Sequence, residues 1–251
     1  MELGEIIAER KTKTVYKIDG KTVKLFVENY SKANILNEAL NQARVEEGTD
    51  LSIPKLVSVT KIENRWALIS EYIEGKTLSS LIEENPDRLD EYMELFVEIQ
   101  LEVLSKNVPL LTPIKDKFRR KLTEATNIDD NTRYELLQRL EGMKNHTKLC
   151  HGDFNPSNIV IKDDGSYAIL DWSHVTQGNA SADSARTYLL FSMQGQADLA
   201  EKYLDLFSLR SGIAKSNIQR WIPIVAATQM TKGKEDEQEF LKRWIDVIDF
   251  Q

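Results

Sequence analysis

The chain has 251 residues, of which 41% are hydrophobic and 29% charged, and a formal net charge of −7 at pH 7. This composition is typical of a soluble globular protein with a sizeable core in one or two domains. The acidic balance argues against a general nucleic-acid binder, whose footprint is basic, and is compatible with a cationic substrate. One cysteine excludes an internal disulfide, and with three histidines it argues against a closed zinc site. Because no leader segment and no membrane-length apolar run is present, we expect a cytoplasmic protein without a membrane partner.

The first 74 residues predict an antiparallel sheet with one helix after its third strand. Short apolar or β-branched runs alternate with turn signals at Asp19-Gly20 and Glu63-Asn64-Arg65. The expected strands cover residues 3–8, 14–18, 22–27, 55–61 and 66–72. Ser31 is a candidate N-cap for the helix, which continues to Glu46. Its apolar stripe is expected at Ala33, Leu36, Leu40 and Ala43.

From Thr77 onward the pattern becomes helical. The expected helices follow Thr77 and cover residues 87–106, 114–126, 130–143, 197–211, 215–230 and 236–248, with another beginning near Ala182. Asp129 and Asp130 lack the ligand spacing of a calcium loop, so helix capping explains them better. The sequence therefore predicts an α+β fold in which residues 1–74 form a small sheet lobe and residues 75–251 form a larger, mostly helical lobe.

The stretch from Leu149 to Asp171 carries the strongest functional signal. Apolar runs at residues 159–161 and 168–170 flank a turn at 163–166, which predicts a hairpin. Three side chains with oxygen atoms, Asp153, Asn158 and Asp171, lie at the strand ends. Asn158 and Asp171 can converge as hard oxygen ligands for Mg²⁺, which leaves Asp153 to accept or orient a proton. Phosphoryl-transfer enzymes use an aspartate and a metal-binding Asn–Asp pair in this way.

The run His151-Gly152-Asp153-Phe154-Asn155-Pro156-Ser157-Asn158, with Ile169-Leu170-Asp171-Trp172, closely resembles the paired motifs of the aminoglycoside phosphotransferase and choline kinase family. That family is similar to protein kinases in fold but phosphorylates small molecules. The resemblance implies a two-lobed, protein-kinase-like fold that binds the nucleotide in the sheet lobe and carries the catalytic loop and acceptor site in the helical lobe. It also implies ATP, with GTP as the alternative, Mg²⁺, and a small-molecule hydroxyl acceptor.

The resemblance assigns roles to four residues of the sheet lobe. Lys24 matches the lysine that contacts the nucleotide phosphates, and Glu38 matches the helix glutamate that pairs with it; Lys21 is a weaker rival for Lys24. Glu71 and Ile73 lie in a stretch similar to the family's hinge, so we expect their backbone groups to contact the adenine edge. One turn departs from the pattern. Residues 9–13 contain no glycine, and their three basic side chains either meet the phosphates by charge or are simply solvated.

Each of these residues also has an ordinary structural explanation. Asp153 would then be a turn aspartate, and Lys24 and Glu38 would be surface charges. Cys150 beside His151 is better explained as a core thiol than as half of a catalytic pair, because adjacent strand residues face opposite ways. Trp172, Ser173, His174 and Trp221 would line an acceptor pocket or, in the plainer interpretation, form core and surface.

We interpret the sequence as an ATP- and Mg²⁺-dependent kinase that transfers the γ-phosphate to a hydroxyl group of a small molecule, and the acidic balance of the chain is compatible with a cationic acceptor. In this interpretation Asp153 orients the hydroxyl, Asn158 and Asp171 bind Mg²⁺, and Lys24 holds phosphates. The alternative is a non-catalytic nucleotide-binding module on the same fold, which the glycine-free turn favours. Only a short segment separates Asp171 from the next expected helix, which argues against a protein kinase with its long activation segment.

Overall fold

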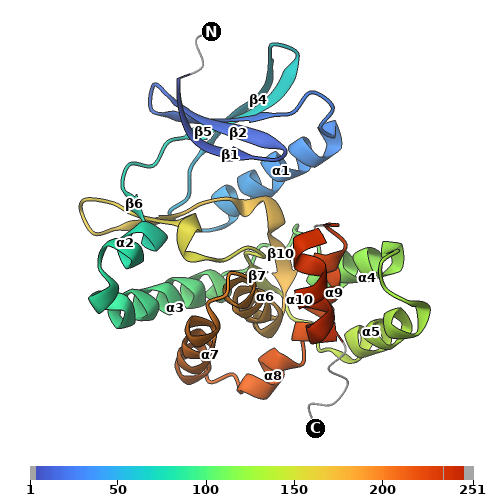
Figure 1. Ribbon diagram of the computed structural model, residues 1–251. Coiled ribbons are helices and arrows are strands. Elements are labelled where there is room, and N and C mark those ends of the chain that lie inside the picture. Colours follow the sequence, from blue (N-terminus) through green and yellow to red (C-terminus); the bar gives the residue numbers. More distant parts are fainter. Residues whose placement is uncertain (1–3, 234, 246–251) are drawn as a thin grey trace. The chain divides into compact units, whose positions relative to one another are not determined.

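The computed structural model describes residues 4–233 and 235–245 (Figure 1). The described residues form two compact units. Unit 1 comprises the chain up to Pro86 together with Pro156–His174, and unit 2 comprises Asp87–Asn155 and the chain from Val175 onward. The hairpin that follows the catalytic loop therefore belongs to unit 1, whereas the predicted lobes of residues 1–74 and 75–251 stay a prediction. None of the helices in the described ranges combines the length and apolar character that crossing a membrane requires.

Unit 1 contains the predicted antiparallel sheet. Its strands are β1 (Glu5–Arg10), β2 (Lys13–Ile18), β3 (Lys21–Phe26), β4 (Leu56–Ile62) and β5 (Arg65–Glu71), in the order β1-β2-β3-β5-β4. Both expected turns are confirmed. Asp19 and Gly20 have positive φ angles, as do Glu63 and Asn64, and two such residues let a hairpin turn match the strand twist. The tight turn at Asp19-Gly20 fixes the register of β2 on β3 from Ile18↔Lys21 to Lys13↔Phe26.

The helix α1 (Lys32–Gly48) begins as predicted, but it buries a different face. The Ser31 hydroxyl accepts a hydrogen bond from the Asn34 N–H, so the N-cap is confirmed. The predicted apolar stripe is wrong, because Leu36 and Leu40 are 45% and 48% exposed. The buried face consists of Ile35, Glu38, Ala39, Asn41, Gln42 and Val45. Two of its polar residues have partners. Gln42 donates to the Pro54 carbonyl, and Glu38 pairs with Lys24.

A second, three-stranded sheet completes unit 1. It consists of β6 (Lys76–Thr77), β8 (Ile159–Ile161) and β9 (Tyr167–Ile169), in the order β6-β8-β9. The predicted hairpin is confirmed, since β8 and β9 pair from Ile159↔Ile169 to Ile161↔Tyr167. Thr77 caps the short helix α2 (Leu78–Glu84) as expected. Gly75 has φ +138°, and a Cβ there would lie 2.3 Å from the Ile161 carbonyl oxygen, so only glycine fits beside this hairpin.

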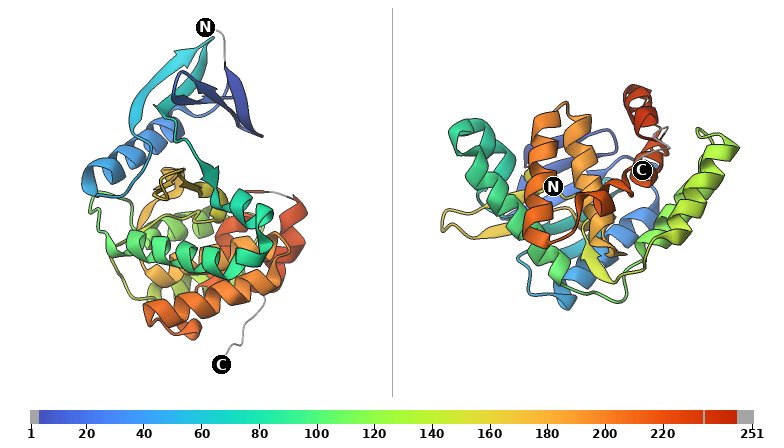
Figure 2. Two further views of the ribbon diagram at one scale, coloured as in Figure 1. Left: turned by 90° about the vertical axis from the view of Figure 1, so that its left-hand side faces the viewer. Right: turned by 90° about the horizontal axis from the view of Figure 1, so that it is seen from below.

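Unit 2 is mostly helical, as predicted. It contains α3 (Leu89–Ser105), α4 (Ile114–Glu124), α5 (Asp130–Gly142), α6 (Ala180–Met193), α7 (Ala197–Ser211), α8 (Lys215–Gln219), α9 (Ile222–Met230) and α10 (Glu235–Ile245). A short ladder joins β7 (Lys148–Cys150) to β10 (Thr176–Gly178). The helix α6 packs against α7, and α3 packs against α7 (Figure 2). Asp129 caps α5, so the capping interpretation is confirmed.

The core of unit 2 forms around aromatic rings. The centroid of the Phe96 ring lies 4.8 Å from that of Phe154, which follows Asp153, and 5.8 Å from those of Phe191 and Tyr203. One predicted helix, residues 215–230, is divided into α8 and α9 because Pro223 lies in the first turn of α9, where its missing N–H is tolerated. Val247, expected on the face of the last helix, lies outside the described residues.

Candidate active site

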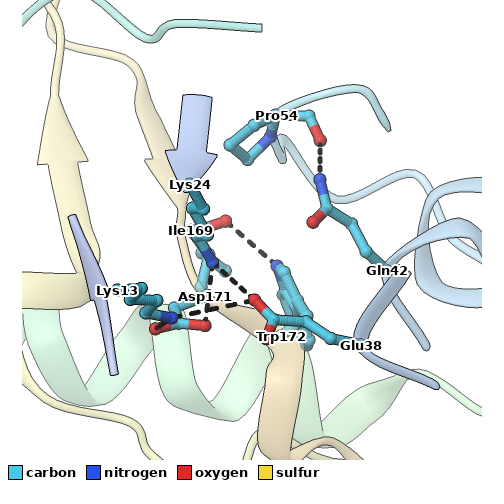
Figure 3. A network of polar contacts seen from close by, with 8 residues as sticks. All are labelled: Lys13, Lys24, Glu38, Gln42, Pro54, Ile169, Asp171 and Trp172. Carbon is cyan, nitrogen blue, oxygen red and sulfur yellow. Dashed lines mark hydrogen bonds and ion pairs between the residues drawn. The ribbon is translucent and has the colours of Figure 1, made fainter. Parts of the chain in front are cut away.

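Three predicted site residues meet within unit 1 (Figure 3). Lys24 comes from β3, Glu38 from the buried face of α1, and Asp171 from the chain between β9 and the 3₁₀ turn Trp172–His174. The Lys24 Nζ lies 2.9 Å from Glu38 Oε1 and 3.1 Å from Asp171 Oδ1. The alternative that Lys24 and Glu38 are solvated surface charges is therefore wrong. The rival Lys21 is exposed and, three positions along the strand, projects from the other face of β3.

A fourth residue, Lys13, joins this cluster. Its Nζ lies 3.8 Å from Glu38 Oε1 and 3.7 Å from Asp171 Oδ2, and its side chain is only 16% exposed. Lys13 is the last residue of the glycine-free turn and the first of β2, so one of the three basic side chains of that turn reaches the site. The register of the β2–β3 hairpin could have predicted the position of Lys13 from the sequence. Lys13 faces Phe26 and Val15 faces Lys24, so alternation places both lysines on one face of the sheet.

The charges of this cluster favour the ionised forms of Lys24 and Asp171. Burial opposes the charged form of Lys24, but the carboxylates of Asp171 and Glu38 outweigh it and raise the pKa of Lys24. Burial likewise opposes ionisation of Asp171, but the ammonium groups of Lys24 and Lys13 outweigh it and hold the pKa of Asp171 well below its ordinary value. Asp171 also has φ +57°, a left-handed conformation that costs an L-residue about 1 kcal/mol. Such a conformation is typical of functional sites.

Asn158 is held beside the strand end that precedes Asp171. It closes the 3₁₀ turn Pro156–Asn158, and its carbonyl accepts a hydrogen bond of 2.7 Å from the Leu170 N–H. The amide of Asn158 and the carboxylate of Asp171 are oxygen ligands of the kind that Mg²⁺ prefers. Among the described residues, no three His, Cys, Asp or Glu side chains form a metal-binding group. These donors thus fit a metal that takes its remaining ligands from phosphate oxygens and water.

The predicted hinge follows β5. The Glu71 N–H donates to the Lys55 carbonyl at 2.9 Å, and the Tyr72 N–H donates to the Gly20 carbonyl at 2.9 Å. Glu71 can therefore offer a ligand only its carbonyl oxygen, whereas Ile73 lies outside the strands, just before Gly75. Contact of either residue with a nucleotide stays a prediction.

The predicted catalytic loop lies in unit 2, where α6 supports it. The Gly152 N–H donates to Asp183 Oδ1 at 2.7 Å, and the Thr187 hydroxyl donates to the Phe154 carbonyl at 3.0 Å. His151 is fully buried, and its Nδ1 accepts a hydrogen bond from the Asp153 N–H. Burial raises the pKa of Asp183, while the bond from Gly152 opposes that rise. His151 and Asp183 thus shape the loop that presents Asp153.

Arg186, for which the sequence patterns predict no role, contacts the predicted catalytic residue Asp153. Its Nη2 lies 3.5 Å from Asp153 Oδ1, and the two side chains are 12% and 28% exposed. Arg186 stands one turn beyond Asp183 on α6, so the helix that holds the loop backbone also holds the carboxylate. Burial lowers the pKa of Arg186, and the charge of Asp153 opposes that shift. The pair orients the Asp153 carboxylate.

The remaining candidates have the plainer explanation. Cys150 is buried, and burial raises the pKa of its thiol well above the ordinary value, so it is a core thiol. Trp172 and Trp221 are buried as well, and the Trp172 indole donates to the Ile169 carbonyl at 3.0 Å. Core packing, rather than an acceptor pocket, accounts for both tryptophans.

Most of this chain matches the model of a known protein family. Residues 19–216 match the model of the phosphotransferase enzyme family, which covers every predicted site residue. The chain belongs to this phosphotransferase family. The family is one of phosphotransferase enzymes, and this chain is one of its members. A comparison with curated proteins found no match.

Solved structures of other phosphotransferases share the fold. The crystal structure of aminoglycoside phosphotransferase APH(4)-Ia has a TM-score of 0.73 and 16% identity, covering 97% of this chain and 92% of that one. APH(2'')-Ib with ADP bound has a TM-score of 0.60 and 15% identity, covering 98% and 92%. APH(3'')-Id from Streptomyces rimosus has a TM-score of 0.60 and 17% identity, covering 89% and 92%. The predicted protein-kinase-like α+β fold is confirmed.

Proposed function

We propose that this phosphotransferase moves the γ-phosphate of ATP to a hydroxyl group of a small molecule in a Mg²⁺-dependent reaction, with GTP as the alternative donor. The observation that carries the proposal is the partly buried cluster in which Lys24 bridges Glu38 and Asp171 at 2.9 and 3.1 Å. A partly buried lysine held between two carboxylates matches the phosphate-contacting arrangement of kinases. The proposed setting is the cytoplasm, where ATP is abundant.

Each residue of the cluster has a definite task in this proposal. Lys24 contacts the α- and β-phosphates, and Glu38 fixes its flexible stem. Lys13 supplies a second ammonium group where relatives use glycine amides, so charge replaces backbone hydrogen bonds in this turn. The carbonyl of Glu71 and the backbone of Ile73 meet the adenine edge.

Asp171 and Asn158 would hold the Mg²⁺, which neutralises charge on the phosphates when it is bound. Asp153 orients the acceptor hydroxyl and takes its proton, while Arg186 holds the Asp153 carboxylate at 3.5 Å. The acceptor oxygen then attacks phosphorus directly and no covalent enzyme intermediate forms, because such sites act mainly by positioning and electrostatics.

Thermal unfolding with ATP or GTP, with and without Mg²⁺, tests the nucleotide site. A ligand at a hundredfold excess over its Kd stabilises the folded state by ~2.7 kcal/mol. We expect a Mg²⁺-dependent stabilisation in the wild type that is lost in Asp171→Ala. Asp163→Ala is the matched control, because Asp163 is an exposed residue in the turn of the same hairpin. Equal stabilisation of Asp171→Ala and wild type would contradict the metal assignment.

The glycine-free turn favours one alternative, a nucleotide-binding module without turnover. In that case ATP and Mg²⁺ would stabilise the protein, but no acceptor would cause phosphate transfer. Turnover of ATP with a panel of alcohols, sugars and hydroxy acids, followed by release of ADP, separates the two functions. For the kinase and for the binding module alike, the cytoplasmic location and the preference for ATP are proposals.

A further inference from the structure

The basic side chains of the turn between β1 and β2 are of two kinds. Arg10 and Lys11 are exposed, and the Arg10 guanidinium donates to the carbonyl of the preceding residue at 3.0 Å. Lys13 is only 16% exposed, and its Nζ lies 3.7 Å from Asp171 Oδ2 and 3.8 Å from Glu38 Oε1 (Figure 3). Solvation of a turn lysine explains the first two residues but not the third.

The position of the Lys13 ammonium group is built into the hairpin. Lys13 pairs with Phe26 across the β2–β3 ladder, and its Nζ lies 5.8 Å from the centroid of that ring. The carbonyl of Thr12 accepts a hydrogen bond of 3.0 Å from the Val27 N–H, which ties the turn to the end of β3. The backbone is therefore held beside β3, and the lysine side chain extends from it past an aromatic ring to the two carboxylates.

Asp171 has an ammonium group beside each of its carboxylate oxygens. Its Oδ1 lies 3.1 Å from Lys24 Nζ, and its Oδ2 lies 3.7 Å from Lys13 Nζ. The two lysines also share Glu38 Oε1, at 2.9 and 3.8 Å. Protein kinases bring two Mg²⁺ ions to the corresponding aspartate and asparagine, and the ions neutralise the β- and γ-phosphates. In this chain a cation of the protein itself lies beside the second oxygen of that aspartate.

Partial burial increases the effect of this charge. The side chains of Lys13 and Lys24 are 16% and 14% exposed, so water and salt screen their charges weakly. A second divalent ion on Asp171 would be repelled by the Lys13 ammonium group, whereas nucleotide phosphates are attracted to it. Lys13 thus favours the phosphates over a second metal ion.

We propose that Lys13 replaces a second divalent cation, so that a nucleotide bound to this chain needs one Mg²⁺ instead of two. The inference rests on the proposed function and specifies how that site neutralises the phosphates. The ammonium group supplies part of the charge that a second ion would bring. Because it is held by the hairpin, it is in place before the nucleotide binds, and its contribution does not depend on the concentration of free metal.

Counting bound Mn²⁺ tests the inference without turnover. Mn²⁺ takes the place of Mg²⁺ and is detected by electron paramagnetic resonance. The site is filled with AMP-PNP or GMP-PNP, whichever stabilises the wild type. We expect one bound Mn²⁺ per nucleotide in the wild type and two in Lys13→Met. Lys13→Arg keeps a cation at this position and should bind one. Lys11→Met, which removes an exposed lysine of the same turn, should also bind one.

A double variant locates the additional ion. Lys13→Met combined with Asp171→Ala should lose the second Mn²⁺, and its retention would mean that the ion is bound elsewhere and would overturn the inference. The inference is overturned as well if the wild type binds two Mn²⁺, or if Lys13→Met binds only one. Circular dichroism checks the fold of each variant, and Lys13→Gln takes the place of Lys13→Met if the latter does not fold.

The dependence of nucleotide affinity on Mg²⁺ is a second readout that a purely structural lysine would not produce. Calorimetric titration with the same nucleotide analogue, at constant ionic strength, compares about 1 mM with about 20 mM free Mg²⁺. At the lower concentration Lys13→Met should bind roughly tenfold more weakly than the wild type. Most of this loss should be recovered at the higher concentration, because a second ion then binds by mass action. A loss that Mg²⁺ does not relieve would overturn the inference.

The outcomes separate this inference from the proposed function. A wild type that binds the nucleotide with two Mn²⁺ and transfers phosphate would overturn the role of Lys13 while the kinase assignment stands. A wild type that binds it with one Mn²⁺ and turns over no acceptor would overturn the kinase while the role of Lys13 stands. A wild type that binds neither nucleotide would overturn both.

Discussion

The polar clusters of the two units differ in how their charges are balanced. In unit 1, Lys13 and Lys24 face Glu38 and Asp171, so two positive groups are paired with two negative ones. In unit 2, Lys117, Lys121 and Arg186 repel one another, and burial makes each of them a weaker base. The first cluster is neutral by itself and suits a nucleotide that arrives with its own metal ion. In the second, Arg186 pairs with Asp153 at 3.5 Å, and burial lowers the pKa of Arg186.

Asp153→Asn should produce the largest effect. The amide keeps the size of the side chain but neither takes a proton nor pairs ionically with Arg186, so kcat should fall by roughly 10²–10⁴-fold. Binding of ATP in unit 1 should stay as in the wild type. Steady-state release of ADP measures the first effect and calorimetry the second, with Asp163→Asn as the control. A variant with more than a tenth of the wild-type kcat would contradict the role of Asp153.

Replacing Lys24 should reduce activity more than replacing Lys13. Lys24 contacts its carboxylates at 2.9 and 3.1 Å, whereas Lys13 approaches the same groups at 3.7–3.8 Å. We expect Lys24→Met to lower kcat/KM for ATP by roughly 10²-fold or more, and Lys13→Met to raise KM roughly tenfold with a smaller effect on kcat.

Lys11→Met is the matched control for both variants, because Lys11 is an exposed lysine of the same glycine-free turn. A rise of KM in Lys11→Met equal to that in Lys13→Met would mean that the turn acts through its total charge. Unchanged kinetics in Lys13→Met would mean that the second lysine only neutralises Asp171.

The charge of Lys117 should lower the stability of the folded protein at neutral pH, compared with an uncharged side chain at the same position. Lys117 has a pKa of about 7 in the folded protein, well below its unfolded value. Between these two values the unfolded chain binds more protons, so the free energy of unfolding of the wild type rises with pH. Lys117→Met should therefore raise the free energy of unfolding at pH 7 by on the order of 1–3 kcal/mol, and this gain should shrink toward pH 10.

Urea unfolding of both proteins at pH 7 and pH 9.5 measures that difference. Lys144→Met removes an exposed lysine, so its free energy of unfolding should match that of the wild type at both pH values. The prediction is contradicted if Lys117→Met is less stable than the wild type at pH 7, or if the stability difference between the two proteins does not change with pH.

Sequence patterns predicted most of the architecture and the residues with short-range signals. The paired turns, the caps at Ser31, Thr77 and Asp129, and the hairpin after Asn158 all depend on neighbouring residues, and all are present. Lys24, Glu38 and Asp171 were found because a family motif fixes their spacing, and the structure brings them together.

Arg186 and Lys117 were missed for a physical reason, and Lys13 was predicted only as one of the three basic side chains of its turn. Each is an ordinary basic residue on a helix or strand, and its meaning depends on which distant groups face it. Lys13 was within reach, since the tight turn at Asp19-Gly20 sets a register that puts it on the face of Lys24. Arg186 on α6 contacts Asp153, and Lys117 on α4 is repelled by Arg186; no local pattern specifies the packing of these elements.

The face of α1 shows most directly how a pattern of apolar residues misleads. Leu36 and Leu40 are exposed, whereas Ile35 and Val45 are fully buried beside Glu38 and Gln42. We expect Leu36→Ser and Leu40→Ser to change the free energy of unfolding by less than about 0.5 kcal/mol each, while Ile35→Ala lowers it by about 2–4 kcal/mol. Urea unfolding of the three variants measures these changes. A loss above 1 kcal/mol in either serine variant would place the leucines in the core and restore the stripe predicted from the sequence. If all three predictions hold, α1 is positioned by a buried face whose polar residues, Glu38 above all, serve the site rather than the core.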